Sequence, residues 1–268
     1  MGKIYGLLIT IMLLCIGCQW QLKPNDADSD KQQISVQRYD RIEHLYLTTG
    51  DYAALQQMNT VYPIQTRMLI EDVLHLGHVN DPDINKKFLY FFQDSTLQTM
   101  LADVQHQYAD MDDISQELET SFLRLKEELP EIELPQIYTQ IGSFDESIVV
   151  GNNTLGISLD KYLGADYPFY MAHYTEEQRH MMDRSMIVPD CIGFYVLSLY
   201  PLPAYLQVSQ TERDQHMGVI QYVVNKITER TVFQNEWVKQ VDAFVKRYPQ
   251  MTISQLLSVS DSTFFKKY

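Results

Sequence analysis

The sequence predicts a mainly helical α+β single domain with a small antiparallel or mixed sheet. Over most of the chain, apolar residues recur every three or four positions, as they do on the buried face of a helix. Residues 136–170 differ, because they hold the clearest alternation of β-branched and polar residues. The same stretch contains Gly151-Asn152-Asn153-Thr154, residues that tolerate the positive φ of a hairpin turn. We therefore expect helices to surround a small sheet.

Residues 1–17 have the form of a lipoprotein signal peptide. One basic residue, Lys3, precedes an apolar run from Ile4 to Ile16. That run is too short to cross a hydrocarbon core of about 30 Å as a helix, so it is typical of a secretion signal. We expect the signal peptide to end at residue 17.

Cys18 is the expected acylation site. Gly17 precedes it, and a small residue before a cysteine at the end of an apolar run resembles the bacterial lipobox, in which the thiol is acylated. Cys15 is the alternative, but the bulky Leu14 occupies the position that should be small. Ordinary cleavage and an uncleaved anchor stay open as further alternatives. Acylation at Cys18 would tether the protein to a membrane, with each buried CH₂ contributing about 0.8 kcal/mol.

A polar segment separates this signal from the expected globular domain. Residues 18–35 are poor in aliphatic side chains and include Pro24, so we expect a flexible tether that cannot bury enough apolar surface to fold. The globular domain is expected at residues 36–268.

The charge balance limits the classes of partner. The chain carries a formal net charge of −14, and loss of Lys3 with the signal makes it −15. Nucleic-acid binding needs a basic surface, so we expect no nucleic-acid partner. The same charge disfavours direct binding to anionic headgroups, so membrane attachment depends on the lipid. After Cys18 the one remaining thiol is Cys191, which excludes an intramolecular disulfide in the mature protein.

Helical periodicity dominates the chain up to residue 129. The clearest pattern places Ile114, Leu118, Phe122, Leu125 and Leu129 on one face, and Pro130 closes that helix. In this half we expect helices at 38–46 (or a strand-to-helix junction), 52–58, 66–76 (ended by Gly77), from Asp83 or Asn85 to 92, from Asp94 or Ser95 to 104, and 113–129.

The sheet is expected from three strands and the hairpin turn. They are predicted at 137–141, 147–150 and 155–159. In the last strand the odd-numbered residues should face the core and the even-numbered ones a polar side, because side chains alternate. After the sheet we expect helices at 176–184 (capped by Thr175), 189–199, 211–228, 233–245 and 253–257.

Few residues form a motif with catalytic or metal-binding spacing. His75 and His78 share a helix face, and Glu177 with His180 forms one Glu-x-x-His unit. A zinc or di-iron site needs further ligands, and the chain contains no HExxH, so we expect no metal and no cofactor. The chain also lacks G-x-S-x-G and phosphate-loop motifs, and Cys191 lies in an apolar helix where a structural thiol is expected.

The polar cluster after the hairpin is the candidate binding site. Asp160 stands at a strand end, where its side chain can cap loop amides or meet a partner. Two carboxylates, a lysine and tyrosines within eleven positions are suited to a sugar, a peptide or a cation. The alternative is structural: the aspartates satisfy turn amides, and the tyrosines pack with their hydroxyls at the rim. The candidate residues are Asp160, Lys161, Tyr162, Asp166 and Tyr170.

Several segments resemble the lipoproteins related to the gliding motility protein GldB of Bacteroidetes. They are VQRYDRIEHLYL, FLYFFQD, ELPEIELPQIYTQIGSFDESIVV, LGISLDKYLGADYPFY and the closing LLSVSDSTFFKKY. The resemblance implies a lipid-anchored envelope protein, present in gliding and non-gliding species, and it supplies no catalytic residues. The chain is also similar to predicted zinc proteases, whose HExxH would fall near residues 190–194, where this chain has no histidine pair. That kinship would make the fold zincin-like without its metal.

We therefore expect a lipid-anchored lipoprotein of the bacterial cell envelope, placed at the outer membrane. Its expected role is a non-enzymatic binding or assembly component with an envelope protein as partner. The alternative is a degenerate or cryptic zincin-like hydrolase.

Overall fold

A four-stranded mixed sheet lies at the centre of the computed structural model, which describes residues 34–258. The strands are β1 (Val36–Gln37), β2 (Gln136–Gln140), β3 (Ile148–Gly151) and β4 (Thr154–Ser158), in the order β1-β2-β4-β3. β2 runs parallel to β1 and β4, whereas β3 and β4 form the antiparallel hairpin. The predicted mainly helical α+β class is confirmed, and of the two kinds of sheet expected the mixed one is present.

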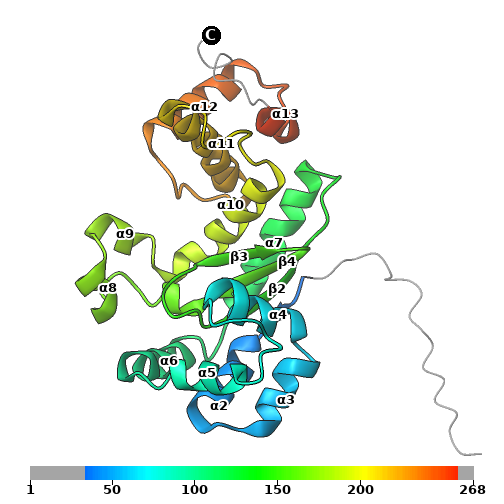
Figure 1. Cartoon of the computed structure of the whole chain (residues 1–268). Helices are drawn as coiled ribbons and strands as arrows, with labels where there is room; N and C mark the ends of the chain where they lie inside the picture. The colour runs from blue at the N-terminus through cyan, green and yellow to red at the C-terminus, as the bar shows by residue number, and fades with distance from the viewer. Residues whose placement is uncertain (1–33, 259–268) are drawn as a thin grey trace, which may run out of the picture. The chain divides into compact units, whose positions relative to one another are not determined.

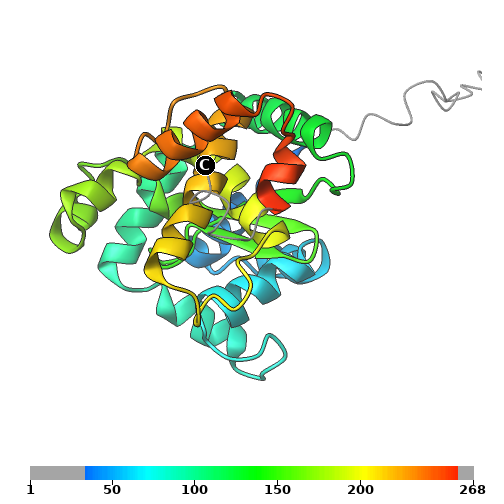
Figure 2. The same ribbon diagram turned by 90° about the horizontal axis from the view of Figure 1, so that it is seen from above.

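The helices form two groups, one on each side of the sheet (Figure 1). α2 packs on β2, and α10 packs on β3 and β4. Seen from above, α11 to α13 (gold to red) lie in front of the green sheet (Figure 2). The helices are α2 (Tyr39–Thr49), α3 (Tyr52–Thr60), α4 (Pro63–Arg67), α5 (Ile84–Phe91), α6 (Ser95–Gln107), α7 (Asp112–Glu128), α8 (Pro168–His173), α9 (Glu176–His180), α10 (Ile187–Leu199), α11 (Gln210–Thr228), α12 (Glu236–Arg247) and α13 (Ile253–Ser258).

Several predicted helices begin or end at other residues in the structure, and the one at 233–245 begins at Glu236, where Asn235 caps it. The one at 66–76 begins at Pro63, becomes a π-helical stretch, η2 (Met68–Val73), and ends before Gly77, with His75 at a φ of 51°. The one at 176–184 stops at His180. The one at 189–199 begins at Ile187, which a proline in the first turn permits because that position needs no backbone donor. The structure also adds α8, which was not predicted.

The polar face predicted for the last strand is wrong. All five residues of β4 are buried, including Gly156 and Ser158. β4 is an inner strand, and helices cover both sides of the sheet, so alternation of residue type does not separate core from solvent here. Gly156 pairs with Tyr138 of β2, and a Cβ at residue 156 would lie 2.6 Å from the Tyr138 ring.

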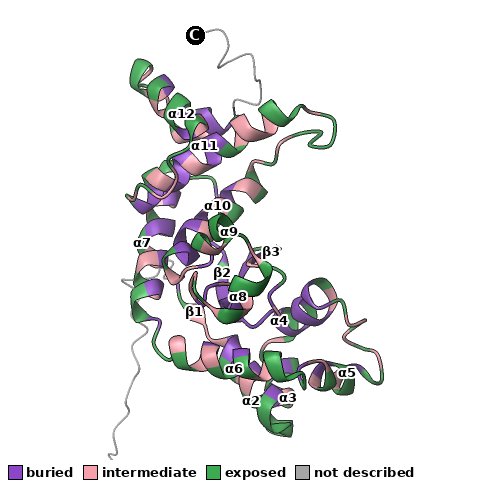
Figure 3. Ribbon diagram, turned by 90° about the vertical axis from the view of Figure 1, so that its left-hand side faces the viewer, coloured by how far each residue is buried: buried purple, intermediate pink, exposed green. Residues whose placement is uncertain are grey.

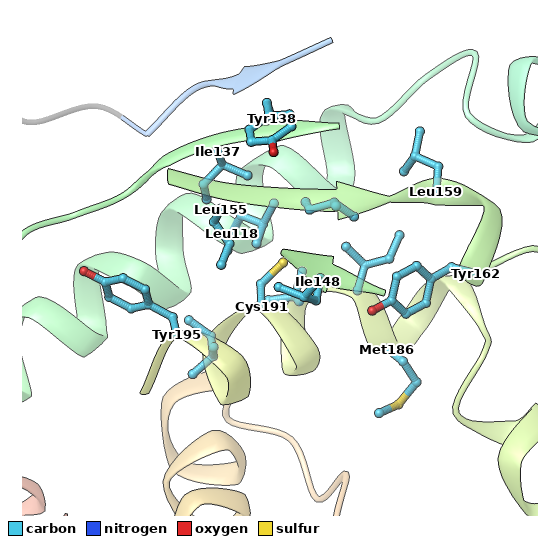
Figure 4. Close-up of a cluster of buried hydrophobic side chains, with 14 of the residues drawn as sticks. Leu118, Ile137, Tyr138, Ile148, Leu155, Leu159, Tyr162, Met186, Cys191 and Tyr195 are labelled. Atoms are coloured by element: carbon cyan, nitrogen blue, oxygen red, sulfur yellow. The ribbon is translucent and has the colours of Figure 1, made fainter. Parts of the chain in front are cut away.

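One hydrophobic core joins the sheet to both helical groups. Figure 4 shows part of it, where Leu118 of α7 and Cys191 of α10 lie with Ile148 and Leu155 of the sheet. The Cys191 thiol is fully buried, and burial raises its pKa well above the usual value. Within residues 34–258, no helix combines the length and the apolar character needed to span a bilayer.

Candidate functional site

Two loops meet at one edge of the sheet because β2 and β4 are parallel neighbours. The loop that follows β2 contains Gly142, Ser143 and Phe144. The turn that follows β4 is η3 (Leu159–Lys161), which contains Asp160. The candidate binding residues therefore begin at the sheet edge where the loops after β2 and β4 lie side by side.

The Asp160 carboxylate joins the two loops. It accepts hydrogen bonds from the backbone N–H groups of Gly142 and Phe144, both at 2.6 Å, and it is fully buried. Burial raises the pKa of Asp160, and those two backbone donors oppose the shift. Ser143 and Phe144 both adopt positive φ, at 56° and 68°, so the carboxylate holds a backbone shape that is uncommon for residues with side chains.

Lys161 and Tyr174 also bond to this loop, at the Phe144 carbonyl. Lys161 Nζ donates to the Phe144 carbonyl oxygen at 2.9 Å and lies 4.9 Å from the centre of the Tyr174 ring. The Tyr174 hydroxyl donates to the same oxygen at 3.2 Å. Lys161 is half-buried, so its ammonium group is directed into the loop.

The hydroxyl groups of Tyr162 and Tyr170 also bond inside the protein. Tyr170 donates to the backbone oxygen of Asp160 and accepts from the Leu163 N–H at 3.2 Å. Tyr162 donates to Asp190 at 2.8 Å. Burial raises the pKa of Asp190 to about 7, although the bond from Tyr162 lowers it. Both tyrosines are buried, so their hydroxyls are not at the rim.

Asp166 is the one candidate residue that faces solvent. Its side chain is 99% exposed, and Arg179 Nη1 lies 3.9 Å from its carboxylate. Asp160, Tyr162 and Tyr170 hold the loops together from within. Contact with a partner through the candidate site stays a prediction, and in this geometry Asp166 and its exposed neighbours would make it.

Helices α8 and α9 form an arm beside Asp166, which we define as residues 168–182. Figure 3 shows α8 and α9 as mainly exposed, and α9 buries none of its residues. The arm is attached by the Phe144 ring, which stacks on Phe169 at 4.0 Å, centre to centre, and by Arg179, whose Nη1 donates to the Ala165 carbonyl at 2.7 Å. Met171 is 54% exposed and Met181 40%. The sequence reasoning missed these methionines, since helical spacing does not single them out.

Two further carboxylates beneath the same sheet edge were also missed. Glu43 is fully buried and accepts from the Ile141 N–H at 2.9 Å, and burial raises its pKa well above the usual value. Asp40 is buried and paired with Arg38 at 2.7 Å. Their spacing could have indicated burial, because both carboxylates lie on the same helix face as Tyr39 and the other residues that α2 buries.

The histidine pairs do not assemble into a larger ligand set. His78 lies 3.8 Å from Glu71, and His180 lies 3.8 Å from Glu176 rather than joining Glu177. Across residues 34–258, no three His, Cys, Asp or Glu side chains are grouped so that they could hold a metal ion. Cys18, the expected lipidation site, lies outside the described residues, as do the signal peptide and most of the tether.

Comparison with known proteins identifies the family. A family model described as gliding motility protein GldB matches residues 21–231, which includes every strand and the helices from α2 to α11. The helices α12 and α13 follow the matched range. Searches of curated proteins and of solved structures found no match. Because the matched range covers more than half of the chain, this protein belongs to the family of the gliding motility protein GldB.

Proposed function

We propose that this protein is an envelope lipoprotein held to the outer membrane through acyl chains on Cys18. Its family is a gliding-motility lipoprotein family, which supports a place in the cell envelope. The short apolar leader and the Gly17-Cys18 pair support the anchor. The net charge of −14 supports a lipid anchor over electrostatic attachment.

We further propose that its role is to bind an envelope protein rather than to transform a substrate, with the arm and Asp166 as the contact surface. The observation that carries this proposal is the fixed base of an exposed arm. Asp160, Lys161 and Tyr174 clamp the Phe144 loop, and Phe144 stacks on Phe169 of the arm. A surface that is held in one conformation loses less entropy when it binds.

The chemistry of the arm suits a protein partner. Met171 and Met181 are exposed, and methionine side chains adapt to irregular apolar surfaces. Glu176 within the arm and Asp166 just before it are exposed, and they supply charge of the kind found in the polar rim of a protein interface.

The anchor is tested by Cys18→Ala. We expect the variant to lose labelled palmitate and to leave the membrane fraction, whereas Cys15→Ala should behave like the natural protein once the leader is removed. Palmitate in Cys18→Ala would show that another residue is acylated.

The contact surface is tested by Met171→Asp combined with Asp166→Lys. After crosslinking in native envelopes, we expect the variant to lose the crosslinked protein bands that the natural chain forms. Tyr90→Asp is the matched control, because Tyr90 is 80% exposed on α5, outside the arm. Equal loss of bands in the control, or none in the double variant, would remove the arm as the contact surface.

A further inference from the structure

The segment between α10 and α11 is unusual in its composition. No Asp, Glu, Lys or Arg occurs from residue 191 to residue 211, in a chain of which 21% is charged. α10 occupies the first part of this segment, and a loop at 200–209 reaches the start of α11. Uncharged stretches of this length normally belong to the core, so exposure of such a stretch calls for a physical reason.

The loop exposes its apolar residues instead of burying them. Leu206 is 92% exposed and Tyr205 is 57% exposed. Pro201 and Pro203 are also exposed, and Leu199 and Phe194 at the adjoining end of α10 are 40% and 41% exposed. Apolar side chains are therefore exposed in the second half of α10 as well as in the loop.

The conformation of the loop is defined by contacts within it. The Gln207 N–H donates to the Ala204 carbonyl at 2.7 Å, which closes a turn next to Leu206. Arg213 of α11 donates to the Tyr205 and Val208 carbonyls at 3.1 and 2.9 Å, and its guanidinium group lies 5.4 Å from the Tyr205 ring centre. These contacts hold Leu206 at the tip and Tyr205 beside the first basic residue after the segment.

We propose that the loop at 201–208 is a second membrane contact that inserts Leu206 into a zwitterionic lipid surface. Leucine at a tip, tyrosine behind it and arginine at the base match the order of acyl chains, interface and phosphates in a bilayer. The loop at 201–208 carries no charged residue of its own, and the tyrosine and arginine behind Leu206 are side chains that favour the interface of a bilayer. The net charge of −14 argues against an anionic surface.

This inference adds a protein-borne contact to the proposed lipid anchor, and it rests on that proposal for the presence of a nearby bilayer. A loop that enters the headgroup region would also limit the orientations of the domain on the membrane.

The test places an environment-sensitive probe on the loop. The natural lipidated protein carrying Leu206→Cys is labelled with a nitrobenzoxadiazole dye, because Cys191 is fully buried and does not compete for the dye. In phosphatidylcholine vesicles we expect a blue shift and quenching by a lipid spin-labelled near its headgroup. Tyr90→Cys is the matched control on an equally anchored chain, and we expect severalfold weaker quenching there.

The outcomes separate this inference from the anchor. Protein that floats with vesicles but shows equal quenching at residues 206 and 90 would overturn the loop contact and leave the anchor intact. If the chain proves not to be acylated, the labelled protein is titrated with excess vesicles, and no shift at residue 206 at any lipid concentration would overturn the contact. A concentration-dependent shift without vesicles would also overturn it, by indicating a second copy of the chain as the occupant.

Discussion

Asp160 and Asp166 lie six residues apart and meet opposite environments. Asp160 is fully buried and bonded to two backbone donors, whereas the side chain of Asp166 is 99% exposed. Their residue type and neighbourhood in the sequence are similar, so the difference comes from the position of each on the folded chain. The two aspartates therefore form a matched pair for experiments.

We expect Asp160→Ala to lower the free energy of unfolding by about 3 kcal/mol, because it leaves two buried N–H groups without acceptors. Asp166→Ala should change that free energy by less than about 0.5 kcal/mol. Urea denaturation followed by circular dichroism measures both values. Similar losses in the two variants would contradict the role of Asp160 as the clamp between the loops.

Asp190 predicts a pH dependence of stability. Its pKa is about 7 in the folded protein because the group is buried, against about 4 in an unfolded chain. The folded state therefore binds the proton of Asp190 more tightly than the unfolded state does. The protonated group stabilises the folded protein at pH 4, and this contribution to the free energy of unfolding is lost as the pH rises to 7.

Asp190→Asn removes this titration and keeps an oxygen that can accept from Tyr162. We expect the free energy of unfolding of the natural protein, relative to this variant, to fall by about 2–4 kcal/mol between pH 4 and pH 7.5. Urea denaturation across that range measures the difference. A constant difference would show that Asp190 has an ordinary pKa.

At the scale of elements, the inner strand β4 depends on a close contact with its neighbour β2. Gly156 lies opposite Tyr138, and the tyrosine ring occupies the space that a side chain at residue 156 would need. An aromatic ring that covers a glycine on the adjacent strand stabilises the pairing and its register.

We expect Gly156→Ala to cost about 2 kcal/mol through overpacking. Combined with Tyr138→Ala, which removes the ring, the two changes should cost less than the sum of the single variants. Denaturation of all four proteins completes the cycle. Strict additivity would show that the glycine is needed for a reason other than the ring.

At the scale of the whole molecule, contacts link the sheet to both groups of helices. Arg124 of α7 donates to the Ile227 carbonyl of α11 at 3.2 Å and pairs with Glu229 at 2.5 Å. α12 packs on α11, and α10 joins α11 to the sheet. Unfolding of one part should therefore expose the core of the others.

We expect one cooperative transition for the globular domain. In a Trp20→Phe background, fluorescence of the remaining Trp237 reports α12, and circular dichroism reports all helices. Coincident urea midpoints would agree with a single domain at 36–268. Two separated midpoints would show that α12 belongs to an independent unit.

Much of the fold was predictable because it depends on local pattern. The spacing of Ile114 to Leu129 predicts α7, and the asparagine-rich turn predicts the hairpin of β3 and β4. The missed elements have weaker local signals. α8 has six residues and begins at Pro168, and β1 has two residues that form a strand only through pairing with β2.

The position of the candidate site in the chain was predictable, but the orientation of its side chains was not. The run from Asp160 to Tyr170 does begin at the end of a strand, as the sequence predicted. Which side chains turn inward depends on β2, which lies beside β4 and supplies the amides of Gly142 and Phe144. Those amides come from 16 and 18 residues earlier, and no local spacing encodes their position.

The sequence alone determined the helical periodicity, the hairpin, the negative net charge and the family. Each of these is a property of neighbouring residues or of composition. Burial belongs to the folded chain. Parallel pairing of β2 with β4 encloses Asp160, and the same packing leaves Asp166, the arm and Leu206 in solvent. Asp160 is thus buried and Leu206 exposed, the reverse of what is usual for these residue types. The reason is that contacts between distant segments outweigh the preference of any single side chain for water or core.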